Sequence, residues 1–254
     1  MDITERHEMI LKMLNEDGRV KIQELSDKMN VSGVTIRKDL KLLEEKKLLY
    51  RTKGGGSLNN PYMNERPINE KALINYEQKE KIAKEALKLI GDSDSLIIGS
   101  GTTVFQIARF LQPIHPLTVI TPAVKVTIEL CDKKNIEIIQ LGGIIRPNSS
   151  SVTGTNAEKT LEDISTSILF LGVDGIDLDF GLSITNISEA SLNKKMIDAA
   201  QTLVILADSS KFGKRGLGKV CSFDHVHYII TDENAPKSTI KALEEKDIKV
   251  IIAK

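Results

Sequence analysis

The sequence of 254 residues predicts two domains, a small helical one at the N-terminus and a larger α/β domain with a largely parallel sheet. The N-terminal region carries three short helical patterns of apolar residues, whereas residues 96–252 alternate between short apolar runs and helical patterns. Between them, asparagines and prolines gather in residues 59–67 without clear periodicity, which is typical of a linker. We therefore expect domains at 1–57 and 76–254, joined by a linker at 58–75.

Composition places the protein among ordinary globular chains, with 41% hydrophobic and 28% charged residues. The 35 basic and 35 acidic residues cancel, so any nucleic-acid signal must lie in their distribution. No apolar run is long enough to cross a bilayer, and the polar, acidic start is unlike a secretory signal. We expect a cytoplasmic protein without a membrane partner. Its two isolated cysteines, Cys131 and Cys221, should stay thiols.

The N-terminal domain begins with three expected helices, each with apolar side chains at helical spacing. These are Ile10, Leu11 and Leu14 in the first helix, Ile22, Leu25 and Met29 in the second, and Ile36, Leu40 and Leu43 in the third. Residues 15–18 are turn formers and end the first helix. Ser32 can cap the third, because its hydroxyl can accept from the free N–H groups of the first turn.

The third helix has a basic outer face. At about 100° per residue, Val34, Lys38 and Lys41 lie opposite the apolar stripe, with Thr35 and Arg37 on the flanks. Residues 30–53 hold seven cations against three anions, a net charge of +4 within a neutral chain. This layout is typical of a helix-turn-helix whose last helix enters the major groove of double-stranded DNA. Arg37 can then recognise guanine while the lysines neutralise phosphates.

Residues 48–53, followed by the three glycines at 54–56, suggest a wing of two short strands around a turn, with cations directed at the DNA backbone. The DNA-binding candidates are therefore Ser32, Thr35, Arg37, Lys38, Lys41, Arg51 and Lys53. The alternative is a three-helix packing module whose lysines are merely solvated.

A family resemblance favours the first interpretation. The stretch "RHEMILKMLNEDGRVKIQELSDKMNVSGVTIRKDLKLLEEKKLLYRTKGGG" resembles the winged helix-turn-helix of the DeoR family of bacterial transcriptional regulators. That family favours paired arginines before the Asp-Leu and a histidine before the glycines, so Lys38 and Lys53 are departures. Lys38 keeps the charge but lacks the bidentate fork of arginine.

The second domain has a helical pattern at 77–90, followed by alternating strands and helices. Its apolar runs span 96–98, 117–120, 136–141, 168–171, 203–206, 226–230 and 248–252, with helical patterns at 104–111, 123–130, 190–200 and 236–245. Near-continuous apolar strands indicate a largely parallel sheet covered on both faces. Ligands of such folds bind beyond the carboxyl ends of the strands.

The run "GSGTTV" at 99–104 follows the first of these strands. Its glycines permit an unusual backbone, and Ser100, Thr102 and Thr103 place hydroxyls at the start of the next helix, which suits an anion. It is not a dinucleotide fingerprint, because Val104 replaces the third glycine and no acid ends the next strand. A plain tight turn between strand and helix would use the same residues.

Glycine, acid and lysine recur in "LGGIIRP" at 141–147, "GVDGID" at 172–177, "NISEASLNKKM" at 186–196 and "DSSKF" at 208–212. Lys211 offers a charge to a phosphate, and Asp174 and Glu189 can accept from sugar hydroxyls. The set fits a phosphorylated sugar or polyol better than an apolar ligand. The effector-binding candidates are Ser100, Gly101, Thr102, Thr103, Gly142, Asp174, Glu189 and Lys211.

These segments also resemble the C-terminal sensor domain of the DeoR family, so the resemblance covers nearly the whole chain. It implies a fold similar to ribose-phosphate isomerases and CoA transferases, and a phosphorylated sugar intermediate as effector. The motif match assigns the cradle to 101–103, the acids to Asp174 and Glu189, and the phosphate-facing cation to Lys211. Where the family often has a cation four residues after the glutamate, this chain has Asn193.

We therefore expect a DNA-binding regulator that acts as a homo-oligomer, either a dimer or a tetramer. Repression of a sugar or polyol operon is the expected role, and an activator or dual regulator is a weaker alternative. The alternative is an enzyme similar to sugar-phosphate isomerases fused to a DNA-binding module, because Asp174, Glu189 and Lys211 can also transfer protons. No catalytic residue, cofactor or metal is expected. His225 and His227 alternate on an expected strand but lack a third ligand, so packing is their expected role.

Overall fold

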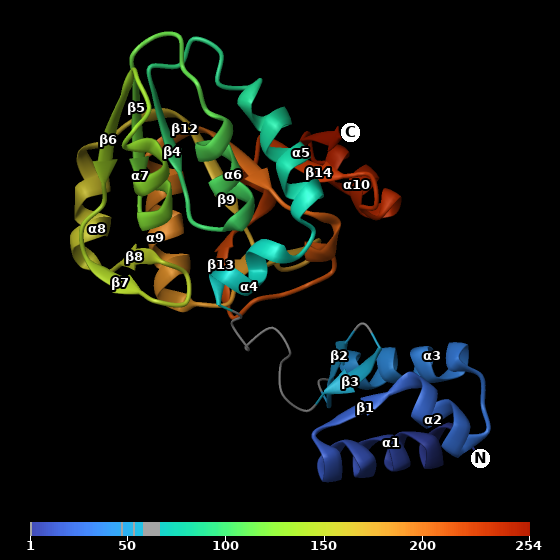
Figure 1. The fold of residues 1–254 in the computed structure, drawn as a ribbon. Helices are drawn as coiled ribbons and strands as arrows, with labels where there is room; N and C mark the ends of the chain where they lie inside the picture. The colour runs from blue at the N-terminus through green and yellow to red at the C-terminus, as the bar shows by residue number, and fades with distance from the viewer. Residues whose placement is uncertain (1, 47, 53, 58–66) are drawn as a thin grey trace. The chain divides into compact units, whose positions relative to one another are not determined.

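The computed structural model describes residues 2–46, 48–52, 54–57 and 67–254. The chain divides into two compact units, 1–64 and 65–254 (Figure 1). The stretch expected to be a linker, 58–75, therefore crosses the division between the units. Its second half contains a short helix, which lies within the second unit.

The first unit contains three helices and a small antiparallel sheet. Its elements are α1 (Ile3–Asp17), β1 (Arg19–Lys21), α2 (Ile22–Met29), α3 (Gly33–Glu45), β2 (Tyr50–Thr52) and β3 (Gly55–Ser57). The expected helices and the two wing strands are present, and β1 adds a third strand in the order β1-β3-β2. Sequence patterning did not predict β1, because a strand of three residues is too short to show an alternation.

Local chemistry sets where these helices begin and end. The hydroxyl of Ser32 accepts from the Thr35 N–H, so Ser32 caps α3 as predicted. Gly18 and Asn30 end α1 and α2 in the left-handed conformation. Gly55 has a different constraint, because a Cβ there would lie 1.8 Å from the Val20 carbonyl oxygen, so only glycine lets β3 approach β1 this closely.

The core of the first unit confirms the predicted stripes. Its buried side chains are Ile10, Leu14, Val20, Leu25, Met29, Ile36, Leu40, Leu43 and Leu49. Leu11 and Ile22 pack against this core while partly exposed. The unit thus has one small core beneath α3, with the outer face of that helix in solvent.

The second unit is built around a seven-stranded parallel sheet in the order β15-β14-β12-β9-β4-β5-β6. The strands are β4 (Ser95–Ile98), β5 (Leu117–Thr121), β6 (Ile136–Gln140), β9 (Thr166–Gly172), β12 (Ala200–Leu206), β14 (Tyr228–Asp232) and β15 (Lys249–Ala253). Each of the seven predicted apolar runs matches one of these strands, so the predicted fold class is confirmed. The main helices are α5 (Tyr76–Leu87), α6 (Thr102–Phe110), α7 (Val124–Leu130), α9 (Ile187–Asp198) and α10 (Lys237–Glu244).

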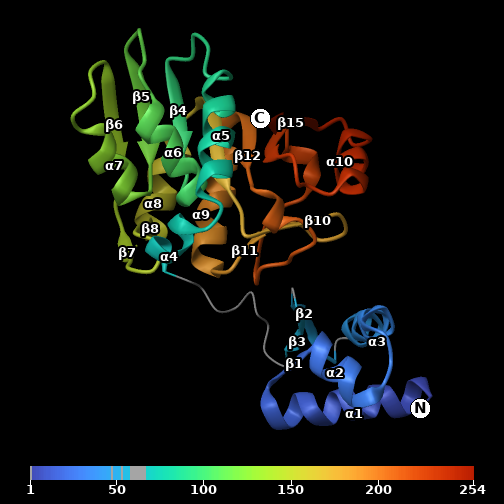
Figure 2. The same cartoon turned by 45° about the vertical axis from the view of Figure 1, so that its right-hand side comes forward.

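Successive side chains of the central strands enter two separate cores, one on each face of the sheet. Leu96 and Ile98 of β4 pack with α5, α6 and α7, whereas Ile97 packs on the opposite face with α9 and α10. Figures 1 and 2 show these helices around the sheet. Both faces are therefore apolar, which is why the strands have near-continuous apolar sequences.

Several short elements, not predicted from sequence, surround the ends of the strands. They are α4 (Ile68–Leu73), the hairpin β7 (Ile144–Arg146) with β8 (Ser151–Thr153), α8 (Thr155–Thr160), the small sheet of β10 (Gly175–Asp177), β11 (Gly181–Ile184) and β13 (Gly218–Cys221), and the 3-10 turns η1 (Leu161–Asp163), η2 (Ser209–Lys211) and η3 (Phe223–His225).

One expectation about the histidines was wrong. His225 and His227 were expected to alternate on a strand, yet η3 contains His225 and β14 begins only at Tyr228. The Nδ1 atom of His227 accepts a hydrogen bond from the Leu203 N–H at 3.1 Å. This histidine therefore satisfies a backbone donor in the middle of β12.

Candidate functional site

The outer face of α3 is the first candidate site. Ser32, Val34, Arg37, Lys38 and Lys41 are exposed on it, and 60% of the Val34 surface is accessible. The Lys41 ammonium lies 3.9 Å from an exposed partner, Glu45. The predicted basic face therefore projects into solvent, with an apolar side chain among its cations.

The remaining predicted DNA-binding residues lie beside this face or outside the residues that the structure describes. Thr35 is half-buried, and its hydroxyl lies 3.0 Å from that of Ser32, so the two side chains share the cap of α3. Arg51 of β2 is half-buried, and its N–H donates to Glu44 at 2.9 Å. Lys53 lies outside the described residues.

Asp39 lies on the inner face of α3 and is 1% exposed. Its carboxylate accepts from Arg6 Nε at 2.8 Å and Nη2 at 3.1 Å, and His7 Nε2 lies 3.4 Å away. The hydrogen bond to Asp39 raises the pKa of Arg6. This bidentate pair joins α3 to α1 and sets the orientation of the basic face. The sequence indicates that Asp39 lies on the inner face of α3, because it follows the buried Ile36 by three residues.

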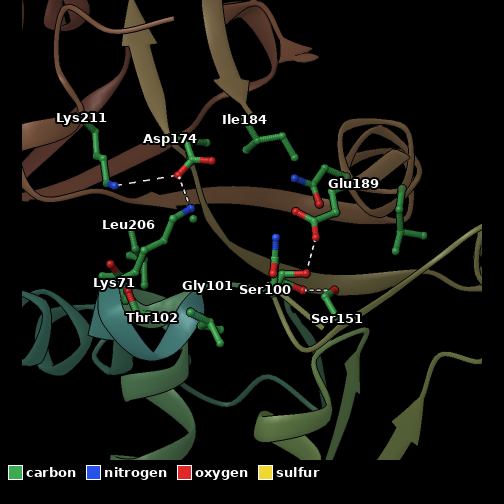
Figure 3. Close-up of a pocket in the computed structure, with 18 residues that line it drawn as sticks. Lys71, Ser100, Gly101, Thr102, Ser151, Asp174, Ile184, Glu189, Leu206 and Lys211 are labelled. Carbon is green, nitrogen blue, oxygen red and sulfur yellow. Dashed lines mark hydrogen bonds and ion pairs between the residues drawn. The ribbon is translucent and has the colours of Figure 1, made fainter. Parts of the chain in front are cut away.

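The second candidate site is a cavity at the carboxyl ends of β4, β9 and β12 (Figure 3). From β4 the chain proceeds outward to β5 and β6, then returns to β9 on the other side of β4. This reversal is the place where ligands bind in parallel sheets. The cavity is lined by the predicted Ser100, Gly101, Thr102, Thr103, Asp174, Glu189 and Lys211.

Gly142 is not among the residues that line the cavity, so its role in effector binding stays a prediction. It follows β6 at the edge of the sheet, is exposed, and does not line the cavity. Two strand positions separate β6 from β9, so the carboxyl end of β6 lies away from the crevice.

The start of α6 forms the cradle. Gly101 caps the helix with φ of 133°, a backbone conformation that disfavours any other residue. The Phe105 N–H donates to the Gly101 carbonyl at 3.0 Å, so the N–H groups of Thr102, Thr103 and Val104 precede the first turn of bonds. Such N–H groups and the helix dipole favour an anion.

Asp174 is the electrostatic centre of the cavity. Lys71 Nζ donates to its Oδ1 at 3.1 Å, and the N–H and hydroxyl of Thr185 each reach Oδ2 at 3.1 Å. Lys211 Nζ lies 3.9 Å from Oδ1. Burial alone would raise the pKa of Asp174, but the charges of Lys71 and Lys211 and the hydrogen bonds from Lys71 and Thr185 together outweigh it, and the pKa lies below its ordinary value.

Glu189 occupies the other side of the cavity and also has partners within the protein. Arg146 Nη1 donates to its Oε1 at 2.5 Å, and the Ser149 hydroxyl donates to the same oxygen. The side chain of Asn186 caps α9 by accepting from the Glu189 N–H at 3.1 Å. Asn193, which replaces the cation frequent in the family, lines the cavity and is 7% exposed.

Two cations escaped the sequence analysis. Lys71 lies in the stretch expected to be linker, and Arg146 lies in the run "LGGIIRP", which was selected for its glycines. An amphipathic pattern was absent for Lys71, because α4 has only six residues. Arg146 could have been selected because it is a cation that follows the glycines of a strand-end motif.

Family models match both units. The model described as the DeoR-like helix-turn-helix domain matches residues 6–61, and that of the DeoR C-terminal sensor domain matches residues 74–233. The chain belongs to the DeoR family. It is 36% identical to the HTH-type transcriptional regulator YulB of Bacillus subtilis over 98% of this chain and 96% of the relative.

Two further DeoR-type relatives match over almost their full lengths. The glycerol-3-phosphate regulon repressor of Escherichia coli is 30% identical over 98% of this chain and 99% of the relative. The regulator GolR of Listeria innocua is 31% identical over 98% of each chain. A ribose 5-phosphate isomerase A from Neisseria gonorrhoeae is similar in structure, with a TM-score of 0.40, 16% identity and coverage of 54% and 53%.

The chain is thus a DeoR-type, DNA-binding transcriptional regulator, and the alternative of an isomerase-like enzyme is not favoured. Among the helices in the described part of the chain, none is long and apolar enough to span a membrane.

Proposed function

We propose that this DeoR-family regulator represses a sugar or polyol catabolic operon in the cytoplasm and that a phosphorylated intermediate of the pathway relieves the repression. One observation carries the proposal: the N-terminus of α6, Lys211 and two carboxylates surround one cavity in a chain that also has a winged helix-turn-helix. The name of one relative, a glycerol-3-phosphate regulon repressor, fits this class of effector.

The cavity matches the chemistry of a sugar phosphate. The free N–H groups of α6 and the Lys211 ammonium suit the phosphate. Asp174 and Glu189 suit the sugar hydroxyls, although each carboxylate already accepts hydrogen bonds within the protein. An effector would therefore share or replace these internal partners. Ile184, Leu192 and Leu206 add apolar surface for the carbon skeleton.

The basic face of α3 supports the DNA-binding half of the proposal. Placed in the major groove, Arg37 donates to a guanine while Lys38 and Lys41 contact phosphates, and Arg51 contacts the backbone beside the wing. We infer a homo-oligomer, a dimer or tetramer, because two half-site contacts joined in one particle bind far more tightly than one.

Operator release tests the function. Fluorescence anisotropy would measure binding to DNA from upstream of this gene and of adjacent sugar genes. The panel would contain ribose 5-phosphate, fructose 6-phosphate, glycerol 3-phosphate and inorganic phosphate, with the unphosphorylated sugars as controls. We expect one organic phosphate to lower operator affinity without being converted. Steady turnover of a panel member, or an operator affinity that no phosphorylated sugar or polyol changes, would contradict the proposal.

A further inference from the structure

Polar contacts rather than a hydrophobic core hold α4 to the second unit. None of its six residues is buried, and Leu73 at its end is 83% exposed. The Ile68 N–H donates to the Asn148 carbonyl at 2.8 Å, and Lys71 donates to Asp174 at 3.1 Å. Because so short a helix is unstable alone in water, these contacts determine where α4 lies.

The junction between α4 and α5 is fixed in the same way. Asn75, in the left-handed conformation with φ of 52°, donates to Asp208 at 2.9 Å. Lys79 of α5 donates to the Lys71 carbonyl at 2.5 Å and is 3% exposed. Asp208 begins the loop that carries Lys211. The junction is therefore attached to the loop that supplies a cation to the cavity.

Lys71 and Lys211 approach the same carboxylate from different elements. Their Nζ atoms lie 3.1 and 3.9 Å from Asp174 Oδ1, one on α4 and the other on η2, and both point to Asp174 in Figure 3. Two ammonium groups therefore face one carboxylate in the cavity that the cradle of α6 also lines. A phosphate that enters the cavity thus meets two cations. Lys211 lies on the loop after β12, whereas Lys71 lies on the short helix α4.

We propose that Lys71 binds the phosphate of the effector and that α4 thereby transmits effector occupancy to the linker. This inference rests on the proposed function of the cavity. Without effector, the ion pair with Asp174 holds α4 in place. With effector, Lys71 turns from Asp174 to the phosphate, and α4 loses its direct ion pair with Asp174.

A shift of α4 matters because of where this helix lies in the chain. The wing ends with β3 at Ser57, and α4, from Ile68, is the next described element. A shift of α4 therefore acts on the segment that connects it to the winged helix. The size of the response is limited by the difference in effector affinity between the two positions of α4.

The test compares Lys71→Met with Lys81→Met, which removes an exposed ammonium from the neighbouring helix α5. Anisotropy gives operator affinity, and calorimetry gives the affinity for each phosphate of the panel. We expect Lys71→Met to bind the most effective organic phosphate about tenfold more weakly, or worse. With or without added phosphate, the operator affinity of this variant should be close to the lowered affinity that the wild type shows at saturating phosphate. Lys81→Met should behave as wild type.

Other results would overturn the inference. Wild-type phosphate affinity in Lys71→Met would remove Lys71 from the site, and wild-type operator affinity without phosphate would remove α4 from the transmission. Lys71→Arg retains the charge and should retain release, which separates a specific role from a folding defect. If no phosphorylated panel member acts on the wild type, the proposed function itself fails.

Hydrogen exchange provides a second measurement that needs no variant. In wild-type protein, the peptide containing residues 68–75 should exchange faster once the effective phosphate saturates the cavity, because the ion pair with Asp174 has been replaced. Exchange in β4, within the sheet, should not accelerate. Unchanged exchange in 68–75 would overturn the transmission through α4.

Discussion

The basic face of α3 draws Arg37, Lys38 and Lys41 from one helix, whereas the cavity draws its charged groups from α4, α9, η2 and the end of β9. The cations of α3 are exposed, and their spacing of 100° per residue is enough to place them together. In the cavity, Asp174 and Glu189 accept hydrogen bonds from residues distant in sequence. A surface site on one helix is therefore local, and a site at strand ends is assembled by topology.

The largest effect on stability should come from the core side chains that hold α3 and its basic face in place. Leu40→Ala removes a fully buried side chain beneath α3, and the small core cannot easily fill the space, so we expect a loss of about 2–5 kcal/mol in the stability of the first unit. Urea denaturation followed by hydrogen exchange of α3 peptides would measure it. Lys38→Ala on the exposed face is the matched control, and an equal loss in both variants would contradict the assigned faces of α3.

Arg37→Ala tests whether the exposed face recognises bases. Loss of a bidentate guanine contact should cost about 1–3 kcal/mol of operator affinity and relax specificity at one position. Lys41→Ala should instead weaken binding to all sequences and reduce the salt dependence. Anisotropy titrations with operator and random DNA at several salt concentrations would separate the two. Equal losses from both variants on both DNAs would rule out base recognition by Arg37.

Thr102→Val tests the cradle with little change in shape. The variant lacks one hydroxyl at the start of α6, so effector binding should weaken by about 1.5 kcal/mol while operator binding without effector is retained. Calorimetry with the effective member of the phosphate panel gives the affinity. Unchanged affinity would place the phosphate elsewhere, and weakened operator binding would indicate a structural role for the hydroxyl.

The smallest effect concerns Lys79, a buried cation that has no equivalent on the face of α3. Burial lowers its pKa to about 8. An unfolded lysine keeps its proton to about pH 10.4, so the unfolded chain binds more protons above pH 8, and stability rises with pH. We expect the free energy of unfolding to rise by about 1 kcal/mol between about pH 8 and 9.

Lys79→Met should lack this contribution, and Lys81→Met, which alters an exposed lysine on the same helix, should keep it. Urea denaturation across this pH range would compare the variants. The same slope in Lys79→Met and wild type would show that Lys79 is not the titrating group.

The sequence alone determined the elements whose patterns are long enough to repeat. The stripe of Ile36, Leu40 and Leu43 predicted both the buried and the basic face of α3, and seven apolar runs predicted the seven strands of the parallel sheet. Strand-end placement also predicted that Asp174 and Lys211 would lie in one cavity. The residues that contact DNA or effector remain predictions from these patterns.

Only the tertiary structure decided which strand ends meet and which side chains pair across the chain. The strand order moved Gly142 to the sheet edge, away from the crevice, although its motif resembles the others. The same folding brought Lys71 to Asp174 across 103 positions and Arg6 to Asp39 across 33. Periodicity reports the face on which a side chain lies and not the partner opposite it. Such pairs form only when separate elements pack, so the groups that hold α4 and orient α3 could not be found in the sequence.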